Sequence, residues 1–480
     1  MNDRKGFGSN FGFLMAAVGS AVGLGNIWGF PNKMGANGGF PFLILYLALA
    51  LCCGVIIMLG ELALGRKTGH GAVGAYQSIS KRFKWLGWLG IAAAALIFSF
   101  YSALGGYCLR YVVVNFGNLI GAEFGTNGVG GADVFQGLLS QPGVSIAFAL
   151  AFMLITMLVV MGGVGGGIER VCSVGMPALF FILIICIIRA CTLPGAADGL
   201  KYMFVPGWSV ANGIIDEAPG FWRVLTAAGG QMFFSLSLGA GVMITYGSYL
   251  DKKQDLGKSA MIIVGMDTVV ALMAGLCVIP GRFALDPSGD LGGPELLFIT
   301  MQNVFDKMGP AGPVFGILFY LLVFFAAISS SISMLEVIVA HFCDKAREKG
   351  KGDRRKLYSA IVVVICAALC ALVCADGMGS NHISPAELLG LAGAKLPGWS
   401  TSWLGLFDSV AEGLLMPLGA LLMCLMISWE LKPDALRQEI LLNGENRPWV
   451  YDFFRLCVKY ITPLCMLMIL YGQISDFFIV

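Results

Sequence analysis

Two glycine-rich segments interrupt apolar stretches of the chain and carry polar groups that could bind a small ligand. The first runs from Gly19 to Asn26, and the second runs from Gly230 to Gly241 and contains Ser235. Glycine costs about 1 kcal/mol per residue inside a helix. If these stretches cross a membrane, unwound backbone is tolerated only where it lines a cavity. Interruptions in two corresponding spans then indicate a transporter built from inverted repeats, although close helix packing through small residues would give a similar pattern.

Asp267 is the most informative ionisable residue, because it lies deep in the apolar run 262–270. A carboxylate inside a membrane is costly and is functional by default. The alternative is a carboxylate bonded only to backbone, with no ion role. Three hydroxyl groups, at Ser329 to Ser331, follow an aromatic-rich run. They could supply oxygen ligands, or they could pack as small residues with their hydroxyls bonded one turn back.

The composition places these residues in a membrane protein. Of 480 residues, 57% are hydrophobic and 12% are charged, whereas soluble proteins carry about 25% charged residues. The net charge of +2 suggests no nucleic-acid partner. Most of the 14 cysteines lie in apolar runs, which is typical of packing residues, and the 3 histidines are scattered, so we expect no structural metal.

Hydropathy predicts an all-α polytopic protein with one transmembrane domain over residues 1–480. The first apolar stretch follows Asp3, Arg4 and Lys5 and continues past a proline, so it is predicted to be a span and not a cleavable signal peptide. Lys and Arg gather in loops on the side of the N-terminus, which predicts a cytoplasmic N-terminus in the cell (inner or plasma) membrane. An odd number of spans puts the C-terminus outside. We expect eleven spans, near 8–35, 39–67, 85–121, 144–162, 167–191, 221–250, 258–281, 310–343, 356–376, 403–430 and 450–475.

The residues from Ala21 to Trp28, followed by Phe30-Pro31 and Asn37-Gly38-Gly39, resemble the first-span signature of the neurotransmitter:sodium symporters. The similarity continues through 231–239 and 324–331, and it covers essentially the whole chain. It implies the leucine-transporter fold of the eleven-span bacterial branch. In that fold two inverted repeats of five spans, here about 8–191 and about 221–430, have broken helices in spans 1 and 6. An extra helix follows at about 450–475.

The resemblance implies two sodium sites. Sodium is a hard cation that prefers oxygen ligands, which carbonyls of unwound segments and hydroxyls supply in this fold. The first site would use the substrate carboxylate together with Ala21, Asn26, Ser235 and Asp267. The second site would take three backbone carbonyls and two hydroxyls, from Gly19, Val22, Ala326, Ser329 and Ser330.

Asp267 also bears on the need for chloride. Animal relatives have Asn at this position in span 7 and need chloride nearby, whereas the bacterial branch has a carboxylate there. We therefore predict that Asp267 supplies the negative charge and that transport requires no chloride. Tyr46 and Gln231 would line the same region.

Gly23 indicates the substrate class, because monoamine carriers have an Asp here that pairs with the amine. A ligand that meets Gly23 must bring its own carboxylate to complete the first sodium site, which favours an α-amino acid. Tyr101 matches the tyrosine that binds that carboxylate, and Phe234 matches an aromatic lid. Ala240 replaces a bulkier residue of the leucine-preferring relative and favours a large apolar or aromatic substrate. The other expected contacts are Ala21, Gly25, Ile97, Ser235, Ser237, Ser330, Ser331 and Met334.

The cytoplasmic gate is expected to be an ion pair between Arg4 and Asp344, supported by Ser248 and Tyr249. The alternative is two interfacial charges that never meet. By the same resemblance, Glu61 would tie the broken parts of spans 1 and 6 together, or it is a simple interfacial charge.

In span 5, Gly167 and Pro177 have the same spacing as a glycine and a proline of the resembled family. The resemblance implies that this spacing allows span 5 to unwind locally, so that water reaches the second sodium. Proline lacks a backbone donor and glycine adds freedom. A simple kink is the alternative.

The outer gate departs from the family pattern. Gly29 replaces the usual Arg, and Ala411 aligns with its acidic partner, although Asp408 and Glu412 lie close. We expect an outer gate that uses Lys33 or another group, or that is only aromatic.

The sequence therefore favours a sodium-coupled amino-acid symporter, a monomer or weak dimer in the lipid bilayer, with two sodium ions. The alternatives are a sodium-dependent sensor with little turnover, and a symporter of a non-standard substrate that bears a carboxylate. We do not expect an enzyme, because no nucleophile is paired with a base and no His-Glu-x-x-His motif occurs.

Overall fold

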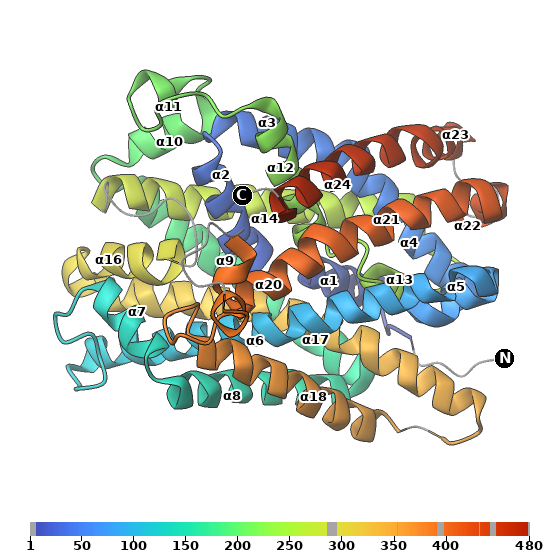
Figure 1. Ribbon diagram of the computed structural model, residues 1–480, viewed down its shortest axis with the longest axis horizontal. Coiled ribbons are helices and arrows are strands. Elements are labelled where there is room, and N and C mark those ends of the chain that lie inside the picture. Colours follow the sequence, from blue (N-terminus) through green and yellow to red (C-terminus); the bar gives the residue numbers. More distant parts are fainter. Residues whose placement is uncertain are drawn as a thin grey trace.

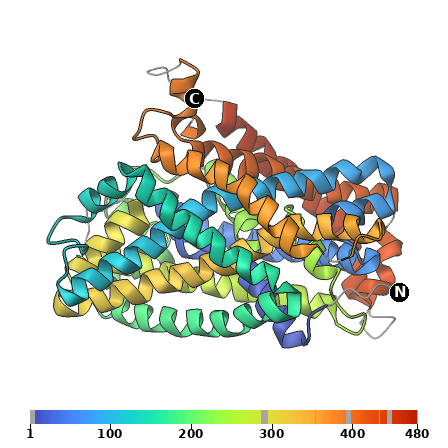
Figure 2. The ribbon, with the colours of Figure 1, turned by 90° about the horizontal axis from the view of Figure 1, so that it is seen from below.

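The computed structural model describes residues 6–285, 295–352, 354–390, 398–431, 433–441 and 448–478, and these residues form helices and no strands. The long helices run side by side along the longest axis of the molecule (Figures 1 and 2). Long helices are expected in a protein that lies in a lipid bilayer, because a helix satisfies its backbone hydrogen bonds internally.

Within the described part of the chain, eleven apolar segments make up the bundle, and several of them contain more than one helix. In chain order they are α1 (Asn10–Ala21) with η1 (Gly25–Gly29) and α2 (Phe30–Ala36); α3 (Phe40–Leu49) with η2 (Ala50–Gly54) and α4 (Val55–Thr68); η3 (Lys81–Phe83) with α6 (Lys84–Ile120); α8 (Pro142–Met161); η4 (Val164–Glu169) with α9 (Arg170–Cys191); α12 (Phe221–Leu236) with α13 (Val242–Gly247); α14 (Leu256–Leu285); η6 (Gly309–Ala311) with α17 (Gly312–Glu348); α18 (Arg355–Asp376); α20 (Trp403–Asp408) with η8 (Ser409–Leu415), α21 (Met416–Leu425) and η9 (Met426–Leu431); and α23 (Pro448–Leu456) with η12 (Cys457–Ile461) and α24 (Thr462–Phe478).

Short helices connect these segments at the two ends of the bundle. They are α5 (Ala72–Ile79), α7 (Gly131–Leu139), α10 (Ala196–Phe204), α11 (Trp208–Ala211), η5 (Leu296–Thr300), α16 (Met301–Asp306), α19 (Pro385–Leu388), η7 (Gly398–Thr401), η10 (Pro433–Leu436) and α22 (Arg437–Ile440). Figure 1 places α7, α10 and α11 at the end of the bundle opposite to the N-terminus.

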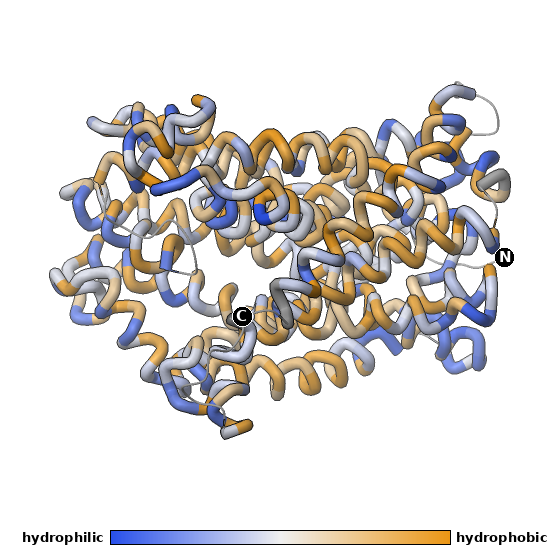
Figure 3. The backbone as a smooth tube through the Cα atoms, turned by 45° about the horizontal axis from the view of Figure 1, so that its top comes forward, coloured by the Kyte–Doolittle hydropathy of each residue, from blue (hydrophilic) through white to orange (hydrophobic). Residues whose placement is uncertain are grey.

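The bundle has the surface of a membrane protein. Within the described residues, nine helical segments are long and apolar enough to cross a membrane, and the bent pair of α1 with η1 and α2, which meet at 44°, adds a tenth. The one expected span that is not among these ten is the sixth, 221–250, which is divided at 237–241 into α12 and α13. Large apolar side chains such as Phe181 (70% exposed) and Val364 (69% exposed) face outward. Apolar residues fill the middle of the helices and polar residues gather towards their ends (Figure 3).

Both expected helix breaks are present. Helix α1 ends at Ala21, and Val22 adopts extended backbone with ψ 101° before η1 begins at Gly25. In span 6, Ser237 (φ 53°), Gly239 (φ 81°) and Gly241 (φ 74°) adopt left-handed backbone, which glycine permits at little cost. Each break leaves backbone groups without their helical partners in the centre of the bundle.

Candidate functional site

The two helix breaks lie against each other. The Gln231 Nε2 atom donates to the Gly25 carbonyl oxygen at 2.6 Å, and the Ser237 hydroxyl donates to the Ser20 carbonyl oxygen at 3.1 Å. A Cβ atom at Gly25 would lie 3.2 Å from the Ser235 Cα atom. Only a residue without a side chain lets the two backbones come this close, so the breaks form one polar centre.

Asp267 occupies one wall of this centre and is fully buried on α14. The Asn26 Nδ2 atom lies 2.8 Å from its carboxylate, the Ser235 hydroxyl 2.9 Å and the Tyr46 hydroxyl 3.3 Å. Four segments, η1, α3, α12 and α14, therefore converge on one carboxylate. The hydrogen-bond partners of this carboxylate are therefore side chains, and its role in binding an ion stays a prediction. A buried charge needs such partners or a bound cation to remain ionised.

A second cluster of oxygen atoms lies between α1 and α17. The Ser329 hydroxyl is 3.4 Å from the Val22 carbonyl oxygen and 3.0 Å from that of Ala326. The Ser330 hydroxyl is 3.3 Å from the Gly19 carbonyl oxygen and 3.5 Å from that of Val22. The structure thus brings together all five residues that were predicted for the second sodium site.

Gly23 lies where Tyr101 and Ser330 meet the break of span 1. The Tyr101 hydroxyl accepts a hydrogen bond from the Leu24 backbone N–H at 2.7 Å. A Cβ atom at Gly23 would lie 2.5 Å from that hydroxyl and would overlap Ser330 Oγ. The Asn26 Oδ1 atom accepts from the Gly23 backbone N–H at 2.9 Å. Backbone donors and a phenol therefore surround a position that admits no side chain.

The other predicted contacts are buried within the bundle. Phe234 lies on the last turn of α12 and is 7% exposed. The Ser331 hydroxyl lies 2.8 Å from that of Thr156 on α8, a partner that the sequence did not indicate. The remaining buried members are Ala21, Ile97, Ala240 and Met334.

The expected cytoplasmic gate is only partly visible, because Arg4 lies outside the described residues. Asp344 accepts a hydrogen bond from the Gly71 backbone N–H at 3.2 Å and lies 3.7 Å from Arg347. The Ser248 hydroxyl donates to the Thr245 carbonyl oxygen at 2.6 Å. The contact with Gly71 places Asp344 beside the start of α5, at the end of the bundle where Figure 1 labels α5.

An ion pair that the sequence analysis missed lies beside these groups. The Tyr249 hydroxyl donates at 2.6 Å to Glu336, which is fully buried on α17 and pairs with Arg355 at 2.5 Å. Glu336 could have been found from the sequence, because it is an acidic residue inside the apolar run that follows Ser331. An acidic residue inside a membrane span is functional by default.

Glu61 contacts the break of span 6. Its Oε1 atom accepts from the Gly239 backbone N–H at 2.7 Å, and the carboxylate faces the first turn of α13. Within the described residues, no hydrogen bond joins Glu61 to span 1. Its visible role is to satisfy backbone donors that the break leaves free.

Span 5 is irregular where unwinding was predicted. Gly163 has φ 79°, and a π-helical turn, η4, carries Gly167 before α9, which contains Pro177. The Glu169 carboxylate in η4 accepts from the Gly8 backbone N–H at 2.7 Å and from the Ser9 hydroxyl at 2.9 Å. This carboxylate, which the sequence analysis did not single out, links span 5 to the start of span 1. A cavity of about 820 Å³ adjoins the glycine-rich stretch.

At the opposite end, Lys33 on α2 forms an ion pair with Glu412 in η8. Gly29 does not leave a void, since a Cβ atom there would lie 2.9 Å from Gln231 Oε1. Ala411 is fully buried. Lys33, one turn beyond Gly29, therefore has an acidic partner in η8, and its part in an outer gate stays a prediction.

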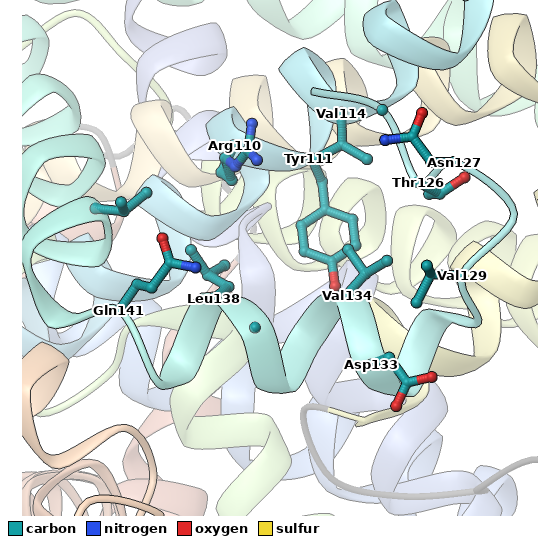
Figure 4. A pocket seen from close by; sticks show the side chains of 13 residues that line it. Arg110, Tyr111, Val114, Thr126, Asn127, Val129, Asp133, Val134, Leu138 and Gln141 are labelled. Carbon is teal, nitrogen blue, oxygen red and sulfur yellow. The ribbon is translucent and has the colours of Figure 1, made fainter. Parts of the chain in front are cut away.

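A separate cavity of about 280 Å³ lies at the far end of α6, between α6, α7 and the loop that joins them. Figure 4 shows Arg110, Tyr111, Leu138 and Gln141 around it. None of the residues predicted for substrate or sodium lines this cavity, so it is not part of the centre described above.

Comparisons with known proteins agree with this architecture. The sequence model of the Sodium:neurotransmitter symporter family matches residues 4–127 and 132–478. An uncharacterized sodium-dependent transporter of Bacillus subtilis is 36% identical, with 97% of each chain covered. A sodium- and chloride-dependent GABA transporter of Drosophila melanogaster is 25% identical over 76% of this chain and 42% of its own length. The crystal structure of MhsT in complex with L-phenylalanine is similar, with a TM-score of 0.83, 34% identity, and 98% of this chain and 100% of that chain covered. The chain therefore belongs to the sodium:neurotransmitter symporter family and is a multi-pass, sodium-dependent membrane transporter.

Proposed function

We propose that this transporter carries an α-amino acid together with sodium, and that the substrate carboxylate binds beside Gly23. The observation that carries the proposal is the Tyr101 hydroxyl, which meets the break of span 1 at the Leu24 backbone N–H, beside Gly23. A carboxylate can accept a hydrogen bond from this hydroxyl. Glycine at this position supplies no side-chain anion to pair with the amine of a ligand that lacks a carboxylate.

The oxygen clusters support two sodium ions as co-transported cargo. At the first, the Ser235 hydroxyl lies 2.9 Å from the Asp267 carboxylate, and the Asn26 side chain contacts the same carboxylate through Nδ2 at 2.8 Å and offers its Oδ1 atom on the side of Gly23. At the second, the carbonyls of α1 and the hydroxyls of Ser329 and Ser330 converge. Both donor sets consist of hard oxygen ligands, as an alkali cation requires.

A large apolar or aromatic side chain suits the rest of the centre. Ile97, Ala240 and Met334 are apolar, and Phe234 lies beside the helix breaks. Ala240 contributes only a methyl group to this region. The similar structure of MhsT was solved with L-phenylalanine, and we propose phenylalanine as the first substrate to test.

Asp267 supports transport without chloride. Its carboxylate already places a negative charge against Asn26, Ser235 and Tyr46. A second anion beside it would raise the electrostatic energy, since like charges at short range repel.

The transport cycle that we propose is alternating access in two inverted repeats, about 8–191 and about 221–430, with a cytoplasmic N-terminus. Sodium and substrate order the broken helices, and Phe234 and Tyr101 close over the ligand. Release of the second sodium towards the cavity beside η4 then frees the inner end of span 1. Because Glu169 joins η4 to Gly8 and Ser9, we expect both segments to move together.

The test is binding of each of the twenty standard amino acids to the purified full-length protein, in sodium and in potassium, without chloride. Binding of phenylalanine or another apolar amino acid only in sodium would support the proposal. Equal binding in potassium would refute sodium coupling. Binding that appears only after chloride is added would refute the role of Asp267.

A further inference from the structure

The separate cavity at the far end of α6 has the composition of a site for a small ligand. Its volume of about 280 Å³ is close to about 300 Å³, where the range of small-molecule pockets begins, and such pockets combine apolar walls with a few placed polar groups. The apolar wall here is aliphatic and comes from α6, α7, α8 and the loop between α6 and α7, through Val114, Val129, Val134, Leu138 and Val144. The cavity therefore suits a ligand that has an apolar chain.

Arg110 supplies a positive charge to this cavity from within α6, well before that helix ends at Ile120. Its guanidinium carbon lies 5.9 Å from the centre of the Phe148 ring, and within the described residues no carboxylate pairs with it. A cation inside a membrane span is costly and is expected to have a partner. Arginine side chains near the end of a span also extend to the lipid surface without any specific site, so a second observation is needed.

Tyr111, the next residue, supplies that observation. Its side chain is fully buried and lines the same cavity, and its hydroxyl has no hydrogen-bond partner in the part of the chain that the structure describes. Figure 4 shows the Tyr111 ring extending from α6 towards α7. Buried polar groups are nearly always paired, and an exception often marks a bound water or ion. An oxygen atom of a ligand would provide the partner.

The acidic residue among those that line the cavity is Asp133, in the first turn of α7. It is exposed, and Figure 4 places it at the end of the cavity opposite to Arg110. The other polar side chains in the wall, Thr126, Asn127 and Gln141, are neutral. The end of the cavity at Arg110 is therefore suited to an anion.

We propose that this cavity binds an amphiphilic anion, whose carboxylate or phosphate group pairs with Arg110 while its aliphatic chain lies against the valines and Leu138. A guanidinium group can hold either kind of anion through two parallel hydrogen bonds. Two sources supply this chemistry beside a membrane span, namely a free fatty acid and an anionic phospholipid. None of the residues proposed for substrate or sodium lines the cavity, so the site is separate from the one for the transported amino acid.

The test counts bound ligands by native mass spectrometry of the full-length protein, released from nanodiscs of neutral phosphatidylcholine. Decanoate is added in one arm, and dioleoyl phosphatidylglycerol is included in the discs in the other. We expect a bound molecule in at least one arm. Retention of decanoate alone identifies a free carboxylate as the ligand, and retention of phosphatidylglycerol alone identifies a lipid headgroup. Decanol, which has the same chain and no charge, should not be retained.

Two variants and a control assign the binding to this cavity. Arg110→Gln should lower the affinity about tenfold or more, because a hydrogen bond to a charged group is lost. Val134→Phe fills the cavity from α7, a connecting helix, and should have the same effect with Arg110 in place, so it serves if the first variant folds poorly. Arg189→Gln is the matched control, because Arg189 lies in the last turn of α9, does not line this cavity and is followed by α10, which Figure 1 places at the same end as α7.

The control should retain the ligand as the wild type does. The proposal is overturned if wild-type protein retains neither probe, if decanol is retained as strongly as decanoate, or if Arg110→Gln and Val134→Phe both bind as the wild type does. An equal loss in Arg189→Gln would also overturn it, because it would indicate general attraction between arginines and lipid. These results do not depend on the proposed transport, since no amino acid is present.

Discussion

Replacement of Asp267 by Asn is the most informative single change, because it keeps the shape of the side chain and removes its charge. In the wild type three side chains, from Asn26, Ser235 and Tyr46, point donors at the carboxylate over 2.8 to 3.3 Å. An amide offers one oxygen in place of two and turns an N–H₂ group towards one of these donors. The variant therefore loses a ligand oxygen, a negative charge and at least one satisfied hydrogen bond.

The size of the effect follows from these contacts. A hydrogen bond to a charged group contributes about 1.5–3 kcal/mol. Loss of about 3 kcal/mol from the sodium-bound state corresponds to about a 100-fold weaker sodium affinity, since 1.4 kcal/mol is a factor of ten. Chloride should recover part of this loss, because an anion can then take the position that the carboxylate has vacated.

The assay is a sodium titration of phenylalanine binding to Asp267→Asn, first without chloride and then with it. Asp306→Asn is the matched control, since Asp306 accepts from Gln302 at 2.9 Å at the end of α16, away from the helix breaks. The control should keep the wild-type sodium dependence. The reasoning is refuted if Asp267→Asn binds sodium as tightly as the wild type in the absence of chloride.

Three further substitutions test the rest of the site. Gly23→Ala should abolish phenylalanine binding in an equilibrium binding assay, because the added methyl group would overlap Ser330 Oγ; measurable binding would contradict the proposed carboxylate position. Tyr101→Phe removes one hydroxyl and should weaken phenylalanine binding about tenfold, the loss of about 1.5 kcal/mol for one hydrogen bond; unchanged affinity would contradict a role of Tyr101 in binding the carboxylate. Glu61→Gln should lower the thermal unfolding temperature, because Gly239 then donates to a neutral acceptor; unchanged unfolding would show that this contact does not stabilise the break.

The fold could be predicted from the sequence because the apolar segments are long and the family motif, the glycine-rich segments and the hydropathy all indicate the same fold. The run from Ala21 to Trp28 identified the family, and the family model and the similar structure of MhsT confirm it. Glycine-rich segments predicted both breaks, which the structure places at 22–24 and 237–241. Hydropathy located the apolar segments because each one exceeds the length that crosses a membrane.

The contacts within the site were only partly accessible to sequence reasoning. Asp267 and the serines from 329 to 331 stood out because polar groups in apolar runs are rare. The bonds of Glu169 to Gly8 and Ser9 did not, because they join residues more than 150 positions apart, and a charge near a loop gives no local signal. The pairing of Lys33 with Glu412 depends on how α2 meets η8, which hydropathy does not specify.

The central claim is that a sodium gradient drives uptake of an amino acid whose carboxylate binds at the helix breaks. The most direct measurement is uptake of labelled phenylalanine into vesicles that contain the purified protein, with sodium outside and potassium inside and no chloride. We expect accumulation above the outside concentration, collapse when sodium is equal on both sides, and no competition by phenethylamine, which lacks the carboxylate. Sodium-dependent binding without accumulation would contradict symport and indicate a sensor, and competition by phenethylamine as strong as by phenylalanine would contradict the role of the carboxylate.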